Sequence, residues 1–124
     1  METDAKFHVQ EQIRSGELEL CWSFVLDYEN AANPFKEVRN QIAAWKKIAT
    51  HSCFLSKEIS AKAAELMSLG LRQMDASHIA CAIHIGANVF LTTDKKILNK
   101  AITDITDIAV MNPIDFLREY ADAK

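Results

Sequence analysis

The sequence predicts an α/β protein: a three-layer α/β/α sandwich with a mostly parallel sheet. Apolar and polar residues alternate over residues 18–24, which is the period of a strand, and a helical pattern follows at once. Later, an apolar helical segment over residues 75–85 precedes a short apolar strand over residues 89–91. Strands that alternate with helices along a chain are typical of parallel sheets, in which each helix crosses over the sheet.

Capping and stop residues place the other elements. Ser23 can cap a helix, Pro34 is allowed in the first turn of the next one, and Gly70 and Gly86 end two later helices. In order, we expect helix 5–15, strand 18–24, helix 23–32, helix 34–48, strand 52–55, helix 56–69, helix 75–85, strand 89–91, helix 94–100, strand 107–111 and helix 113–120. Without a linker or repeat, residues 1–124 are expected to form a single domain.

Composition excludes several classes of protein. Apolar residues make up 49% of the chain and charged residues 25%, which indicates a globular protein, and the net charge of −3 does not announce a nucleic-acid binder. No apolar run approaches about 18 residues, so no membrane span is expected. Cys21, Cys53 and Cys81 lie in apolar stretches, which favours buried thiols and a cytoplasmic location. There is no G-x-S-x-G elbow and no glycine-rich phosphate loop.

Two aspartates stand where a parallel sheet forms its sites. Asp75 opens an apolar helix, and Asp94 comes just past an apolar strand. Both positions belong to the carboxyl edge of a parallel sheet. Carboxylates that gather there indicate a divalent-metal site, and oxygen ligands suit Mg²⁺ or Mn²⁺ better than zinc. Each aspartate alone could instead cap its helix.

The segment around these aspartates resembles a known family. D-A-S-H-I-A-C-A over residues 75–82, followed by N-V-F-L-T-T-D over residues 88–94, is similar to the C-terminal half of a PIN domain. PIN domains are small metal-dependent ribonucleases, and many serve as the toxin of a bacterial toxin–antitoxin pair. The resemblance thus implies hydrolysis of RNA phosphodiester bonds with Mg²⁺ or Mn²⁺, and a small antitoxin protein as a partner.

The same resemblance assigns the site residues. Asp27 and Glu29 do not share a helix face, so at most one of them points to a given site, and the resemblance selects Glu29. It implies that Glu29, Asp75 and Asp94 are the catalytic, metal-binding acids. We expect Thr92, Thr93 and His78 to be weaker accessories, because a threonine hydroxyl could hold a phosphate or a metal-bound water and His78 follows Asp75 by one helical turn. The threonines could equally be ordinary strand-end residues, and a lone histidine in an apolar helix is more often part of the core or its wall.

The chain departs from the family pattern at its start. A PIN domain normally begins with a short apolar strand that ends in an aspartate, whereas Asp4 precedes a helical pattern here. We therefore expect an N-terminally truncated PIN-like domain, from a start codon placed too far downstream or a truncated gene. A central strand would be lacking, which predicts a homodimer or strand-swapped oligomer. The alternative function is a catalytically degenerate PIN-like module that acts in protein interaction or oligomerisation.

Overall fold

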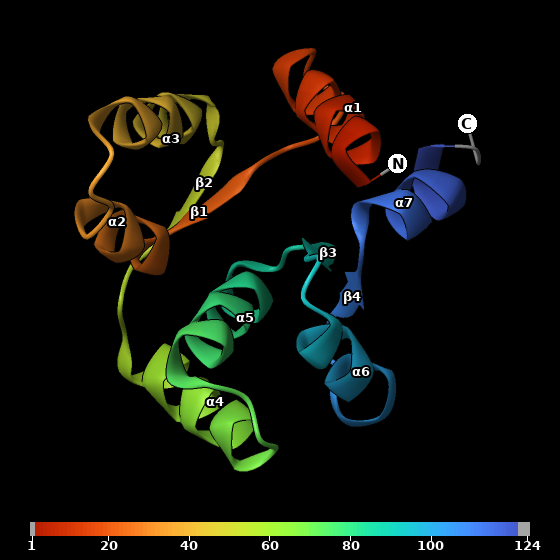
Figure 1. Cartoon of the computed structure of the whole chain (residues 1–124). Helices are drawn as coiled ribbons and strands as arrows, with labels where there is room; N and C mark the ends of the chain where they lie inside the picture. Colours follow the sequence, from red (N-terminus) through yellow and green to blue (C-terminus); the bar gives the residue numbers. More distant parts are fainter. Residues whose placement is uncertain (1, 122–124) are drawn as a thin grey trace. The chain divides into compact units, whose positions relative to one another are not determined.

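The computed structural model describes residues 2–121 and divides into two compact units (Figure 1). One unit runs from Glu19 to Gly86. The other combines the segment up to Leu18 with the segment from Ala87 onward. Each unit has its own parallel strand pair and its own helices.

The unit from Glu19 to Gly86 is built on two short parallel strands. Its elements are β1 (Cys21–Ser23), α2 (Phe24–Ala31), α3 (Lys36–Ile48), β2 (His51–Cys53), α4 (Lys57–Ser68) and α5 (Gln73–Ile85). β1 pairs with β2 so that Trp22 lies opposite Ser52. Helix α5 packs against both strands and against α4. The core of this unit consists of buried side chains from these elements and from the connection between α4 and α5: Trp22, Val25, Cys53, Ile59, Ala63, Leu66, Leu71, Ala76, Ile79, Ala80 and Cys81.

Local signals explain where its helices begin and end. The Ser23 hydroxyl accepts a hydrogen bond from the backbone N–H of Leu26, so the chain passes from β1 into α2 without a loop. Ser56 caps α4 in the same way through the N–H of Ile59. Helix α5 ends at Gly86, whose φ of 80° is a left-handed conformation that glycine adopts without strain.

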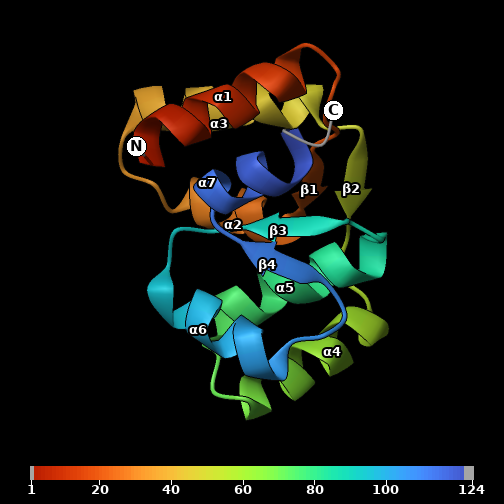
Figure 2. The ribbon, with the colours of Figure 1, turned by 90° about the vertical axis from the view of Figure 1, so that its right-hand side faces the viewer.

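The other unit has the second strand pair. It contains α1 (Glu2–Arg14), β3 (Val89–Leu91), α6 (Lys95–Asp104), β4 (Ala109–Met111), α7 (Pro113–Phe116) and the π-helical turn η1 (Leu117–Ala121). Figure 2 shows β3 and β4 side by side, and their parallel register places Phe90 opposite Val110. Helix α1 packs against α7, and α6 packs against β4. The buried residues of this unit are Ala5, Val9, Ile97, Ile105, Ile108, Pro113 and Phe116.

The α/β class and the parallel strand pairing agree with the expectation, and several boundaries move. The alternating segment 18–24 is a strand only from Cys21 to Ser23, and Phe24 already belongs to α2 because Ser23 caps that helix. Helix α3 begins at Lys36 with Phe35 as its N-cap, so Pro34 lies outside the helix. Helix α5 begins two residues before Asp75. No helix within residues 2–121 is long and apolar enough to cross a membrane.

The cysteines are free thiols, and two of the three are buried. Cys53 and Cys81 are buried and Cys21 is half-buried. Burial, followed by the neighbouring Cys53 thiol, raises the pKa of Cys81 from 9.0 to about 12. The Ser23 hydroxyl acts in the opposite direction by hydrogen bonding to Cys81. Because the ionised thiolate is the reactive form, we regard Cys81 as a packing residue of α5.

This raised pKa predicts a loss of stability at alkaline pH. Below pH 9 the Cys81 thiol is protonated in both the folded and the unfolded chain, so its contribution is constant. Above that pH the unfolded thiol ionises while the folded one keeps its proton, so the free energy of unfolding falls as pH rises toward the folded pKa. Urea unfolding at about pH 7 and about pH 10 measures this fall. Cys81→Ala should lose less stability between the two pH values than the wild type, and an equal loss would contradict the prediction.

Candidate acidic site

Helices α2 and α5 bring Glu29 and His78 into direct contact. His78 Nε2 lies within hydrogen-bond distance of Glu29 Oε1, although the two residues are far apart in the sequence. The His78 side chain is 17% exposed and that of Glu29 is 44% exposed, so the pair lies at the surface with the imidazole as its more protected half. A ring N–H at Nε2 would donate to the carboxylate, and a protonated ring would make the contact an ion pair. This contact fixes the carboxylate end of Glu29 beside α5.

Asp75 lies on the same helix as His78, within its first turn. The two residues are three positions apart on α5, which places them next to each other on one helix face. The positive end of the helix dipole stabilises a carboxylate in this turn. Arg72 Nε, from the N-cap residue, donates a hydrogen bond of 3.3 Å to Asp75 Oδ2. The N-terminal half of α5 therefore gathers Asp75 and, through His78, Glu29 of α2.

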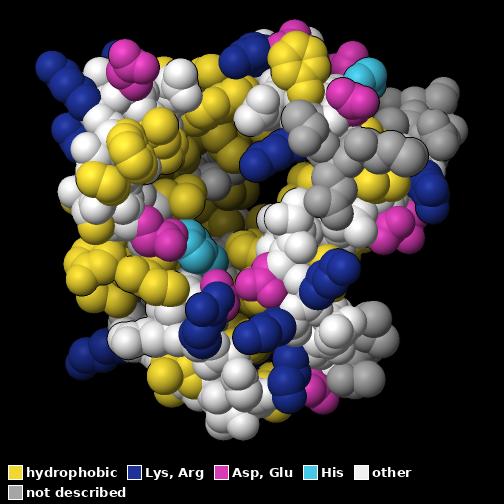
Figure 3. Space-filling view, in the orientation of Figure 1, with side chains coloured by type: hydrophobic (Ala, Val, Ile, Leu, Met, Phe, Trp, Pro, Cys, Tyr) yellow, Lys and Arg dark blue, Asp and Glu magenta, His cyan; other side chains and the backbone are white. Residues whose placement is uncertain are grey.

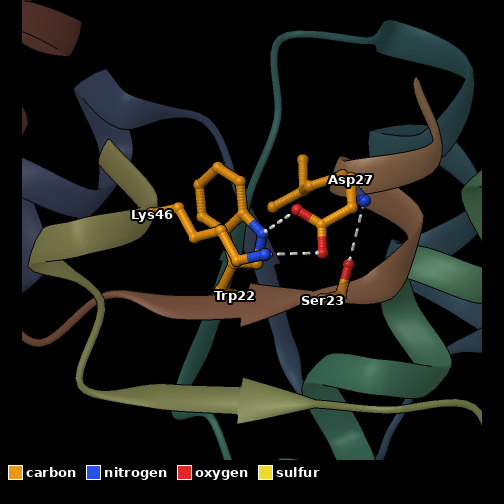
Figure 4. A network of polar contacts seen from close by, with 5 residues as sticks. Trp22, Ser23, Asp27 and Lys46 are labelled. Carbon is orange, nitrogen blue, oxygen red and sulfur yellow. Dashed lines mark hydrogen bonds and ion pairs between the residues drawn. The ribbon is translucent and has the colours of Figure 1, made fainter. Parts of the chain in front are cut away.

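Asp27 is engaged elsewhere, as Figure 4 shows. Trp22 Nε1 donates to Asp27 Oδ1 at 2.9 Å, and Lys46 Nζ donates to Asp27 Oδ2 at 3.1 Å. The Trp22 hydrogen bond, aided by Lys46, lowers the pKa of Asp27 below its usual value. Asp27 thus ties α2 to β1 and α3, whereas Glu29, two residues later, contacts α5. This contrast gives a physical reason why Glu29 is the better site candidate.

Asp94, Thr92 and Thr93 belong to the other unit, where β3 gives way to α6. Asp94 is the N-cap of α6, and its Oδ1 accepts a hydrogen bond of 2.8 Å from the backbone N–H of Lys96. Thr92 Oγ1 accepts a 3.1 Å hydrogen bond from the Asp94 N–H and so holds the backbone of this turn. Thr93 is exposed. The capping role considered for Asp94 is therefore present, whereas Asp75 lies inside the first turn of its helix and Arg72 is the N-cap.

The donor chemistry suits a hard cation. Glu29 and Asp75 offer carboxylate oxygens, which magnesium and manganese prefer. Cys81 is a poor ligand because its raised pKa keeps the thiol protonated. Among the side chains that the structure describes, no three His, Cys, Asp or Glu residues form a group able to hold a metal ion. The carboxylates of Glu29 and Asp75, both in the unit from Glu19 to Gly86, are therefore oxygen donors of the type that Mg²⁺ or Mn²⁺ prefers.

The described chain has an α/β fold with parallel strand pairs and carboxylates near helix starts, a class of fold that hosts many different functions. Comparison with known families narrows this class: the family model of the PIN domain matches residues 16–102. The match spans well over half of the chain, and the protein belongs to the PIN domain family. Members of this family are generally nucleases that act on RNA, and generally depend on divalent metal ions. No curated protein and no solved structure matches the chain.

Two sets of contacts, one in the site and one around Asp27, had no clear signal in the sequence. Arg72 lies inside the matched segment, but arginine is not a usual capping residue, so the sequence did not mark it as the N-cap of α5 or as the donor to Asp75. The Trp22–Asp27–Lys46 contacts join a strand and two helices, so only the folded chain reveals them. A basic residue three positions before an acid at a helix start is the one local hint, because such pairs are neighbours on a helix.

Proposed function

We propose that this protein is a Mg²⁺- or Mn²⁺-dependent ribonuclease of the PIN type that hydrolyses RNA phosphodiester bonds. The observation that carries the proposal is the meeting of Glu29 from α2 with the Asp75–His78 face of α5, inside the segment that matches the family. Two distant segments of the chain supply these side chains. Capping alone explains neither Glu29 nor His78, because both lie beyond the first turn of their helices.

Each residue has a distinct role in this proposal. Glu29, Asp75 and Asp94 would hold the ion. When bound, the ion supplies positive charge that neutralises the acids and polarises the scissile phosphate. His78 orients the Glu29 carboxylate, and Arg72 orients that of Asp75. Thr92 fixes the backbone of Asp94, and the exposed Thr93 hydroxyl is available to a phosphate oxygen.

We also propose that residues 1–124 form a single PIN-like domain, of which the two compact units are parts. The family match supports this proposal, because it runs from residue 16 to residue 102 and so includes segments of both units. A single cooperative unfolding transition, seen alike by far-UV circular dichroism and tryptophan fluorescence, is the expected result. Both tryptophans lie in the unit from Glu19 to Gly86, so separate domains would give transitions that differ between the two probes.

More specifically, we propose that the ribonuclease acts in the cytoplasm as the toxin of a toxin–antitoxin pair. It rests on the family, in which many members are toxins, and the partner would be a small antitoxin protein. Expression that arrests growth, with relief by the product of the adjacent gene, is the expected observation.

A homodimer or strand-swapped oligomer is proposed because each described strand pairs with one neighbour only, which leaves outer strand edges available for pairing. Sedimentation measures the assembly state.

A degenerate PIN-like module that acts in interaction or oligomerisation is the second candidate. One observation favours it: the chain's own side chains already partner two of the acids, since His78 contacts Glu29 and Arg72 contacts Asp75. Carboxylates that are paired in this way can persist in a folded protein without a cation. In that case the folded protein would leave RNA intact in the presence of Mn²⁺.

RNA cleavage by the purified protein in Mn²⁺, with and without EDTA, tests the proposed function. Glu29→Gln should lower the cleavage rate by about 100-fold or more, because the neutral amide cannot stabilise the ion's charge. Asp27→Asn is the matched control on the same helix and should leave the rate nearly unchanged. Cleavage that survives both EDTA and Glu29→Gln would reject the proposal, and absence of cleavage by a folded protein would favour the degenerate module.

Substitutions at Asp94 separate its cap from its proposed metal role. Asparagine caps a helix about as well as aspartate, so Asp94→Asn should leave the free energy of unfolding almost unchanged. Asp94→Ala should lower it by about 1 kcal/mol, because the Lys96 N–H then loses its acceptor. Both variants should lose Mn²⁺ affinity. Urea unfolding and Mn²⁺ titration measure the two effects, and unchanged affinity in Asp94→Asn would restrict Asp94 to capping.

A further inference from the structure

Helix α3 presents an apolar stripe to solvent. Phe35, Val38, Ile42, Trp45 and Ala49 follow one another at alternating spacings of three and four residues, which places them along one side of the helix. None of the residues from Lys36 to Ile48, all of which the structure describes, is buried. Within this stripe Phe35 is 67% exposed and Val38 is 39% exposed, whereas Ile42, Trp45 and Ala49 are half-buried. Figure 3 shows hydrophobic side chains over α3 with Lys and Arg side chains beside them.

The width of the stripe favours a single helix as its occupant. Apolar residues at alternating spacings of three and four are the seam that one helix offers to another in a coiled coil. A helix that lies in a membrane surface needs a broader apolar face. On α3 the stripe is bounded by polar residues, among them Arg39, Asn40 and Gln41. The stripe therefore has the dimensions of a helix–helix contact.

The charge of α3 specifies the chemistry of that helix. Four basic residues (Lys36, Arg39, Lys46 and Lys47) and one acidic residue (Glu37) give α3 a net charge of +3, whereas the whole chain carries −3. Arg39 and Lys46 each follow a residue of the stripe directly, the position at which coiled coils carry the charges that select a partner. Two copies of α3 facing each other would repel, because both carry the same charge.

We propose that α3 is the docking surface for an acidic amphipathic helix of a partner protein. Leucine-like residues of the partner would cover Val38 and Ile42, and its glutamates or aspartates would lie beside Arg39 and Lys46. Lys46 keeps half of its side chain exposed while it contacts Asp27, so it is available to a second carboxylate. The aliphatic Val38 and Ile42 at the centre of the stripe give an RNA backbone nothing to bind, which favours protein as the occupant. Docking of such a helix on α3 does not require ribonuclease activity.

The test uses the full chain and a synthetic probe. The probe is a labelled peptide of about three heptads with leucine at the seam positions and glutamate beside them. The control peptide has the same sequence with lysine in place of every glutamate. Fluorescence anisotropy should show the acidic peptide binding at least about tenfold more tightly than the basic one, with an affinity that falls as salt is added.

Variants assign the binding to α3. Ile42→Asp should lower the affinity for the acidic peptide by about tenfold or more, and Val38→Asp should do the same. Neither residue is buried, so both variants are expected to fold, which circular dichroism checks. Phe54→Ser, at an exposed phenylalanine outside α3, is the matched control and should bind the peptide like the wild type.

Several results would overturn the proposal. Equal affinity for the two peptides would show that the basic residues of α3 do not select an acidic partner. Binding that Ile42→Asp leaves unchanged would show that the peptide does not bind on the apolar stripe. Self-association in sedimentation that Ile42→Asp abolishes would make the stripe an interface between copies of this chain. Ile42-dependent binding to anionic lipid vesicles or to RNA, without binding of the acidic peptide, would make the occupant a membrane or a nucleic acid.

Discussion

Asp75→Asn is expected to reduce Mn²⁺-dependent RNA cleavage by on the order of 100-fold or more while the protein remains folded. The asparagine amide has nearly the size of the carboxylate and can still accept a hydrogen bond from Arg72 Nε, so the first turn of α5 keeps its contact. What disappears is the negative charge of Asp75, which lies three residues before His78 on α5. Cleavage of a structured RNA over time, at saturating Mn²⁺, measures the loss.

Glu58→Gln is the matched control for that experiment. Glu58 and Asp75 both lie in the first turn of a helix in the same unit, so both lose the same favourable interaction with a helix dipole when neutralised. Glu58 contacts none of the site residues in the described hydrogen bonds and ion pairs. We expect its variant to cleave like the wild type. If both variants lose activity alike, the effect of Asp75→Asn comes from helix stability, and Asp75 has no special place in the site.

The features of the fold that the sequence predicted well are those with local causes. The strand Val89–Leu91, the Ser23 cap and the Gly86 helix end match the expectation residue for residue, because a short apolar run, a hydroxyl cap and a left-handed glycine each act within a few residues. The start of α5 differs from the expected residue 75 because it lacks such a local signal. Arg72 caps the helix only by its backbone, with no side-chain hydrogen bond, so no capping residue marked the start.

The candidate site depends on contacts that no local pattern encodes. The sequence could show that Asp27 and Glu29 point in different directions, but only the resemblance chose between them. The structure supplies the cause: Trp22 and Lys46 hold Asp27 on one side of α2, and His78 contacts Glu29 on another. The sequence favours a place for His78 in the core or its wall, and its contact with Glu29 depends on the packing of α2 against α5. Such pairings arise from tertiary structure, which periodicity along the chain does not specify.

Ile79→Ala is expected to lower the free energy of unfolding by about 2–5 kcal/mol. Ile79 lies on α5 directly after His78, is 0% exposed, and is among the largest fully buried side chains of the described residues. Its truncation leaves a cavity in the helix that carries Asp75 and His78, and the loss includes both apolar burial and cavity formation. Urea unfolding followed by circular dichroism measures the change. Ile48→Ala, at an exposed isoleucine of α3, is the matched control and should stay within about 0.5 kcal/mol of the wild type. Equal effects of the two substitutions would mean that α5 does not form the core on which the acidic site is built.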